Sequence, residues 1–276
     1  MMAKVGLHLR ITSTMKEVIE RALRLELPLF QSFLVHQKSK AYVSCTKELI
    51  TFCSLQGKCF DRRYVHGSYF INLASSYKQH ILKKEIELAK RLLFTHVVFH
   101  PGAITDTVER TVGIDRIAKT LDNVLKREND LVIVLENSAH AQKSLGGSLE
   151  ELALIRAKLE HPEKVQFCLD TAHAHVFGYN IVDDEARQKF IEQAVTLLGK
   201  ESLSLIHLND TQESLGSRID RHCIVGEGTL GKDVLKSFIT HPLLKEVPII
   251  LELPELSEEK EDKLLKEVQL WCKEST

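Results

Sequence analysis

The sequence has no long hydrophobic run, no closely spaced cysteine pair and almost no net charge. No apolar stretch reaches the roughly 18 residues of a membrane span, and the N-terminus has no hydrophobic signal segment, so we expect no membrane contact. The six cysteines form no CxxC pair, which predicts reduced thiols in a cytoplasmic protein, nucleoid-associated if the source is bacterial. The formal charge of -1 excludes a globally basic nucleic-acid binder but permits an anionic ligand held through metal ions.

Eight apolar segments alternate with helical patterns along all 276 residues. The expected strands are 5–11, 27–35, one ending at 63–66, 96–100, 131–136, 165–170, 203–207 and 247–252. Near-continuous apolar strands are typical of a parallel sheet covered by helices. Eight such units predict the α/β class and a single (β/α)8 TIM barrel over residues 1–276. An open doubly wound sheet is the alternative, although no GxGxxG motif follows the first strand.

Six of the expected strands end in a residue that can bind a metal ion: His66, His100, Glu136, Asp170, His207 and Glu252. Strand ends in a barrel face the mouth where active sites are assembled. His173 follows Asp170 by three residues, and an extended backbone would project Asp220 and His222 to the same side. A polar strand end can simply meet water, and the last pair can be a solvated loop. Nine donors nevertheless exceed one tetrahedral zinc and predict two or three ions.

Several segments resemble the endonuclease IV family of apurinic/apyrimidinic DNA-repair nucleases. They are Phe99-His-Pro-Gly102, Leu135-Glu-Asn137, Cys168-Leu-Asp-Thr-Ala-His173, His207-Leu-Asn-Asp210, Ser217-Arg-Ile-Asp-Arg-His222 and Gly226-Glu-Gly228. The resemblance covers nearly the whole chain and implies a barrel that binds three zinc ions.

The resemblance also implies a distribution of ligands and a reaction. One zinc would be held by His66, His100 and Glu136, a second by Glu136, Asp170, His207 and Glu252, and a third by His173, Asp220 and His222. Manganese could replace zinc at one site. With Glu136 as a bridging catalytic carboxylate, a monomer would hydrolyse double-stranded DNA 5′ to an abasic site. The products would be a 3′-hydroxyl and a 5′-deoxyribose phosphate, and 3′-blocked ends would also be cleaned.

DNA contacts are expected at three positions. Tyr69 matches the family's aromatic residue that enters the minor groove, although a packed loop tyrosine is the alternative. Arg218 and Arg221 flank the expected ligands and could pair with phosphates, or else be solvated.

The chain departs from the family in its loops. Gly67 stands where many members have aspartate. After Asn137 the chain reads Ser-Ala-His-Ala-Gln-Lys, where the family usually has a glycine-rich turn. Only Lys38 and Lys40 lie in the loop after the second strand, where the family's DNA-penetrating loop commonly carries arginine.

Two other functions fit part of the pattern. A sugar isomerase of the xylose-isomerase-like group also places acids and histidines at strand ends, but it would leave several of the nine donors unused. A barrel that binds damaged DNA without cutting it is the non-enzymatic alternative.

Overall fold

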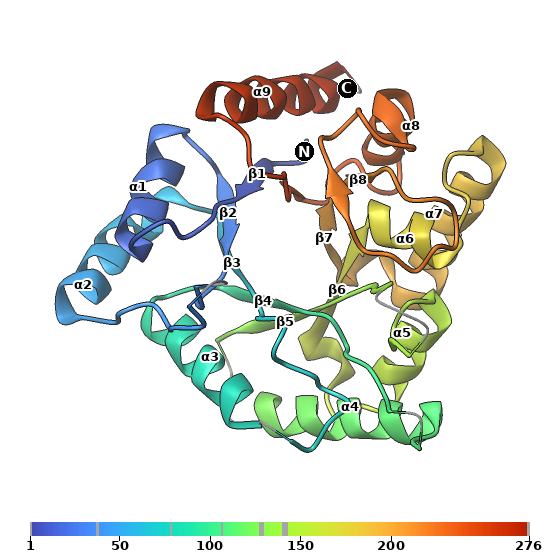
Figure 1. Cartoon of the computed structure of the whole chain (residues 1–276), viewed down its shortest axis with the longest axis horizontal. Helices are drawn as coiled ribbons and strands as arrows, with labels where there is room; N and C mark the ends of the chain where they lie inside the picture. Colours follow the sequence, from blue (N-terminus) through green and yellow to red (C-terminus); the bar gives the residue numbers. More distant parts are fainter. Residues whose placement is uncertain are drawn as a thin grey trace.

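Eight parallel strands close into a barrel with helices on its outside, as Figure 1 shows. The computed structural model describes residues 2–36, 39–77, 79–105, 107–126, 130–139 and 143–274. The barrel strands are β1 Val5–His8, β2 Leu29–Ser32, β3 Arg62–His66, β4 His96–Phe99, β5 Val132–Glu136, β6 Val165–Asp170, β7 Leu203–His207 and β10 Ile249–Leu251. They follow the order β1-β10-β7-β6-β5-β4-β3-β2 around the barrel. The predicted TIM barrel is confirmed, and the open doubly wound sheet is wrong.

The helices of the described chain are α1 Met15–Arg24, α2 Lys47–Gln56, α3 Gln79–Arg91, α4 Arg110–Leu125, α5 Leu149–Ala157, α6 Thr171–Phe177, α7 Asp184–Leu198, α8 Gly231–Ile239 and α9 Glu258–Glu274. Five of these helices, α1, α2, α5, α6 and α7, begin at a residue whose side chain caps the first turn. The Ser148 side chain accepts a hydrogen bond from the Glu151 amide before α5, and Thr14 accepts one from Glu17 before α1. Such bonds satisfy amides that the first helical turn leaves open. No helix in the described part of the chain is both long and apolar enough to cross a membrane.

A layer of buried side chains fills the barrel interior. Seven of the eight strands contribute one residue each: Leu29, Tyr64, Val98, Val134, Cys168, Leu205 and Ile250. A larger apolar cluster lies between the strands and the surrounding helices. Because the interior is packed rather than open, the loops at the carboxyl ends of the strands are the place for a ligand.

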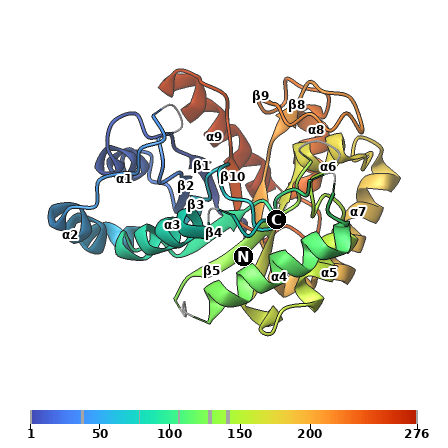
Figure 2. The same ribbon diagram turned by 60° about the horizontal axis from the view of Figure 1, so that its bottom comes forward.

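The structure corrects several predicted boundaries. The first, second and last strands are shorter than expected, and His100 and Glu252 lie one residue beyond β4 and β10 rather than in them. His173 lies in α6, which begins immediately after Asp170, and not in a loop. The stretch after His207 forms a small antiparallel sheet, β8 Asp210–Thr211 with β9 His222–Cys223, which the sequence did not indicate. Figure 2 shows this sheet beside α6 and α8.

Candidate metal centre

The nine predicted donors meet at the carboxyl ends of the strands. His66, Glu136, Asp170 and His207 end β3, β5, β6 and β7. The loops after β4 and β10 supply His100 and Glu252, α6 supplies His173, and the segment around β9 supplies Asp220 and His222. None of these nine side chains is more than 19% exposed. Four carboxylates and five imidazoles withdrawn from water need one another, protons or cations as partners.

The Glu136 carboxylate lies between two sets of histidines. Its Oε2 is 3.3 Å from His66 Nε2 and 3.1 Å from His100 Nε2. Its Oε1 is 2.9 Å from His207 Nδ1. Tetrahedral zinc bonds of about 2.0–2.1 Å separate neighbouring donors by roughly 3.3–3.4 Å. The spacing therefore suits one ion at Oε2, while Oε1 faces a different group.

Glu136 and His207 lie within 4.8 Å of the buried Cys168, and two more groups made only of predicted donors are equally close: Glu136, Asp170, His207 and Glu252, and Asp170, His173 and His222. Asp220 adjoins the second of these groups. Its Oδ2 is 3.1 Å from His173 Nε2, and its Oδ1 is 3.2 Å from His222 Nε2. The structure thus brings the nine residues together in three groups, and their binding of metal remains a prediction.

Backbone carbonyls orient two of the imidazoles. His66 Nδ1 lies 2.8 Å from the Gly67 carbonyl, and His173 Nδ1 lies 2.8 Å from the Asn137 carbonyl. A ring whose Nδ1–H donates to a carbonyl presents its unprotonated Nε2, which is the state that a metal ion requires. Nε2 of both rings therefore points into the centre. Because nearby carboxylates raise the pKa of both rings against the effect of burial, a metal ion that binds there would displace a proton.

Two amide side chains that sequence reasoning missed also support the donors. Gln31 donates to Glu252 Oε1 at 2.6 Å, and its own oxygen lies 3.0 Å from His207 Nε2. Asn209 donates to Asp170 Oδ2 at 2.6 Å and to Glu252 Oε2 at 3.1 Å. Lone amides scattered along a sequence carry no signal of this role. The only signal for Asn209 is its place in the segment His207-Leu-Asn-Asp210, which resembles the endonuclease IV family.

Burial and charge together determine protonation in the centre. Burial lowers the pKa of His100 to about 4, so this ring is neutral near pH 7. Burial also disfavours the charged form of His66, but the hydrogen bond and charge of Glu136 outweigh it and raise the His66 pKa to about 9. Burial disfavours the charged form of Glu136, yet the nearby charge of His207 contributes to holding the Glu136 pKa well below its usual value. Glu136 is therefore a carboxylate at neutral pH.

Asp210 organises the segment that carries Asp220 and His222. Its buried carboxylate accepts five backbone N–H groups, from Thr211, Gly226, Gly228, Leu230 and Gly231, at 2.8–3.1 Å. A Cβ atom on Gly228 would lie 2.3 Å from Asp210 Oδ1, so the backbone can approach the carboxylate only with glycine there. The Gly-Glu-Gly segment thus serves the fold of the loop. Sequence reasoning assigned no role to Asp210.

The loop after β3 is tied to a buried acid on α3. Glu85 is 0% exposed and accepts hydrogen bonds from both the backbone N–H and the hydroxyl of Ser68. The next residue, Tyr69, is 60% exposed. Its ring centre lies 5.9 Å from that of His66 and 6.1 Å from that of His100. Tyr69 is therefore a ring at the rim of the centre and not a core residue.

Both predicted arginine contacts already have partners within the chain. The Arg218 guanidinium lies 3.7 Å from the centre of the Phe177 ring, and Arg218 has a positive φ of 61°. Arg221 is 75% exposed and forms an ion pair of 3.0 Å with Glu213. Exposed pairs of this kind contribute little and exchange readily. Phosphate binding by either arginine remains a prediction.

The structure explains one departure from the family pattern. A Cβ atom on Gly67 would lie 2.4 Å from the Phe99 ring, so Phe99 occupies the space that an aspartate would need. In the loop after β2, Lys40 places its ammonium 5.2 Å from the centre of the Phe70 ring. Lys38 and residues 140–142 of the altered loop after Asn137 lie outside the described residues.

A cavity of about 340 Å³ opens beside the first group of donors. Its lining includes His66 at the end of β3 and, from the loops after β3, β4 and β5, Tyr69, His100, Ser138 and Ser144. Two of the predicted ligands are therefore reachable from outside, as a substrate-binding centre requires.

Comparison with known proteins identifies relatives of the whole chain. Residues 14–275 match the family model described as xylose isomerase-like TIM barrel. The chain is 32% identical over 268 residues to a probable endonuclease 4 of Thermotoga sp. (strain RQ2), covering 94% of this chain and 93% of the relative. The crystal structure of endonuclease IV from Thermus thermophilus superposes with a TM-score of 0.84 at 28% identity, over 98% of this chain and 99% of that one. A D-tagatose 3-epimerase-like protein shares the fold, with a TM-score of 0.71 at 19% identity over 98% of each chain.

Proposed function

The chain belongs to the endonuclease IV family of xylose isomerase-like TIM barrels, and we propose that it is a DNA-repair endonuclease acting on abasic sites. It hydrolyses the phosphodiester bond 5′ to the abasic nucleotide in double-stranded DNA, leaving a 3′-hydroxyl and a 5′-deoxyribose phosphate. The same chemistry removes 3′-blocking groups. The protein acts as a monomer in the cytoplasm. The observation that supports this proposal most strongly is the arrangement in three groups of nine donors whose side chains are at most 19% exposed.

The donor set suits three zinc ions. Imidazole and carboxylate favour zinc or a similar divalent metal, and manganese is an alternative at a site richer in oxygen. The 3.1–3.3 Å separations around Glu136 Oε2 and the carbonyl-oriented rings of His66 and His173 fit such ions. When bound, zinc supplies Lewis acidity, which favours hydroxide formation at neutral pH and stabilises the charge that develops on phosphate.

The chain's own residues position the donors and the substrate. Glu136 connects the first two groups through its two oxygens, and Gln31 and Asn209 hold Glu252 and its neighbours in orientation. Tyr69 stands at the rim, where an aromatic ring can replace the stacking that DNA loses when a nucleotide leaves the helix. An abasic nucleotide has no base to unstack, so its extrusion costs least.

The alternatives explain fewer observations. A sugar isomerase would leave His66, His100 and the Asp220/His222 pair without a role, and the likeness to the epimerase-like protein concerns the fold alone. A barrel that only binds damaged DNA has no need of nine mutually arranged donors.

Cleavage of a duplex with one abasic site, labelled on the damaged strand, tests the proposal. We expect incision on the 5′ side of the site, loss of activity with a chelator, and recovery with added zinc. Glu136→Gln keeps the size of the side chain but removes the charge, so it should still bind the duplex and lose most cleavage. The exposed Glu185→Gln is the matched control. Sugar isomerisation without cleavage would support the isomerase, and tight binding without cleavage in any metal would support the binding protein.

A further inference from the structure

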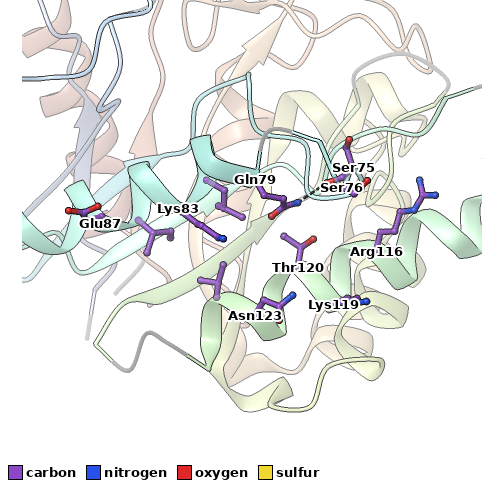
Figure 3. Close-up of a pocket in the computed structure, with 12 residues that line it drawn as sticks. Ser75, Ser76, Gln79, Lys83, Glu87, Arg116, Lys119, Thr120 and Asn123 are labelled. Carbon is purple, nitrogen blue, oxygen red and sulfur yellow. Dashed lines mark hydrogen bonds between the residues drawn. The ribbon is translucent and has the colours of Figure 1, made fainter.

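A groove of about 700 Å³ runs between α3 and α4 on the outside of the barrel, as Figure 3 shows. Helix α4 packs on α5, and α5 packs on α7, whereas the described residues of α3 and α4 are not in comparable contact. The lining residues on each helix span nine positions, 79–87 on α3 and 116–124 on α4. At about 1.5 Å per residue this gives a length of roughly 12 Å, or about two turns of a helix.

The groove combines an apolar floor with a basic rim. Leu82 and Ile86 of α3 and Val124 of α4 form the floor. Lys83 extends from α3, and Arg116 and Lys119 extend from α4, as Figure 3 shows. The aliphatic stems of these basic residues add hydrocarbon to the walls. The lining contains one carboxylate, that of Glu87, against three cations.

The three cations are not neutralised within the described chain. No ion pair there involves Lys83, Arg116 or Lys119, whereas nearby Lys126 pairs with Glu160 and Lys158 pairs with Asp115. A basic rim around hydrocarbon is complementary to a segment with apolar side chains along one stripe and acids beside it. A nucleic acid would use the charges but leave the floor without a partner.

We propose that this groove docks an acidic amphipathic helix of a partner protein. About two turns of that helix lie between α3 and α4, with aliphatic side chains at every third or fourth position on the floor and carboxylates at the rim cations. The groove shares no lining residue with the nine donors or with the cavity beside them, so the partner contacts residues outside the metal centre.

The test uses a blocked, labelled peptide of about 14 residues, near the shortest length at which an isolated helix is populated. Leucines form its apolar stripe and glutamates flank them. One control peptide has lysine for every glutamate, and another is polyglutamate of equal length. The protein variant is Lys83→Glu/Lys119→Glu. Its control, Lys47→Glu/Lys263→Glu, changes two exposed lysines and gives the same net charge.

We expect the leucine–glutamate peptide to bind the wild type and the control variant alike. Binding to Lys83→Glu/Lys119→Glu should weaken by about tenfold or more, and this variant should instead bind the lysine peptide, because both rim contacts have changed sign. Cleavage of an abasic duplex by all three proteins should be equal, which also shows that they are folded. Equal binding to wild type and variant would overturn the proposal. Polyglutamate binding as tight as the amphipathic peptide would overturn the role of the floor, and displacement by undamaged duplex DNA would assign the groove to nucleic acid.

Discussion

Asp210→Asn should open the segment that carries Asp220 and His222 while leaving the barrel folded. The native carboxylate accepts two backbone N–H groups at Oδ1 and three at Oδ2. An asparagine has one acceptor oxygen, so its best orientation keeps three bonds and turns an NH₂ group toward the other two amides. The substitution replaces one carboxylate oxygen by an amide NH₂ group and leaves the side-chain volume nearly constant.

The size of the effect follows from these bonds. Each hydrogen bond to a charged group contributes about 1.5–3 kcal/mol, so two lost bonds cost about 3–6 kcal/mol before the retained bonds weaken. Such a cost approaches the roughly 5–15 kcal/mol that stabilises a whole domain. The segment can detach more cheaply than the barrel can unfold, because none of residues 212–222 is buried. Local opening should therefore precede global unfolding.

Metal content and proteolysis distinguish local from global effects. Asp210→Asn should bind about one metal ion fewer than the wild type, because only the third group of donors depends on this segment, and trypsin should cut faster after Arg218 and Arg221. The urea concentration at which the barrel unfolds should fall less than the loss of two such hydrogen bonds would imply, because the segment opens before the barrel does. The exposed Asp233→Asn is the control and should resemble the wild type. Wild-type metal content and proteolysis in Asp210→Asn would refute the role of this carboxylate as the organiser of the segment.

Three further changes examine the rest of the molecule. Asp220→Ala/His222→Ala should retain about two zinc ions and lose at least about 10²-fold in cleavage rate, as removal of a preorganised electrostatic group does; elemental analysis showing three ions would contradict the third group. Tyr69→Ala should weaken binding to abasic DNA by about tenfold, from about 1–3 kcal/mol of lost stacking, with Tyr69→Phe near normal; a lower melting temperature with unchanged binding would show that the ring stabilises its loop and does not contact DNA. Burial and the charge of Arg62 lower the pKa of His96 to about 3. The stabilisation from neutral His96 is therefore complete above the unfolded pKa of about 6.5 and declines as pH falls toward 3. Between pH 7 and 5 the free energy of unfolding should consequently fall by about 2 kcal/mol less in His96→Gln than in the wild type. Urea unfolding at the two pH values measures this, and equal losses would contradict it.

The order of elements and the positions of the donors could be predicted because both leave local patterns. Continuous apolar strands, helical periodicity and the Ser148 cap depend on neighbours in sequence. The histidines and acids at successive strand ends are visible because each β/α unit repeats at a similar length. Six of the donors were recognised in this way, and the resemblance to one family grouped all nine.

Boundaries and supporting contacts depended on the tertiary structure. The small sheet of β8 and β9 has only two residues per strand, too few to show alternation, and the loop after β9 is held to Asp210 by amides between Gly226 and Gly231. Gln31 reaches His207 across 176 positions, and no local pattern can report a contact of that separation.

The sequence by itself determined the barrel and the residue types at its mouth, because hydrophobic periodicity and strand-end chemistry are encoded within each β/α unit. Only the tertiary structure decided which oxygen of Glu136 faces which histidine, because these contacts arise when different strands come together. The same is true of the gap between α3 and α4. Each helix carries an ordinary amphipathic pattern, and the distance between them depends on the packing of the whole barrel.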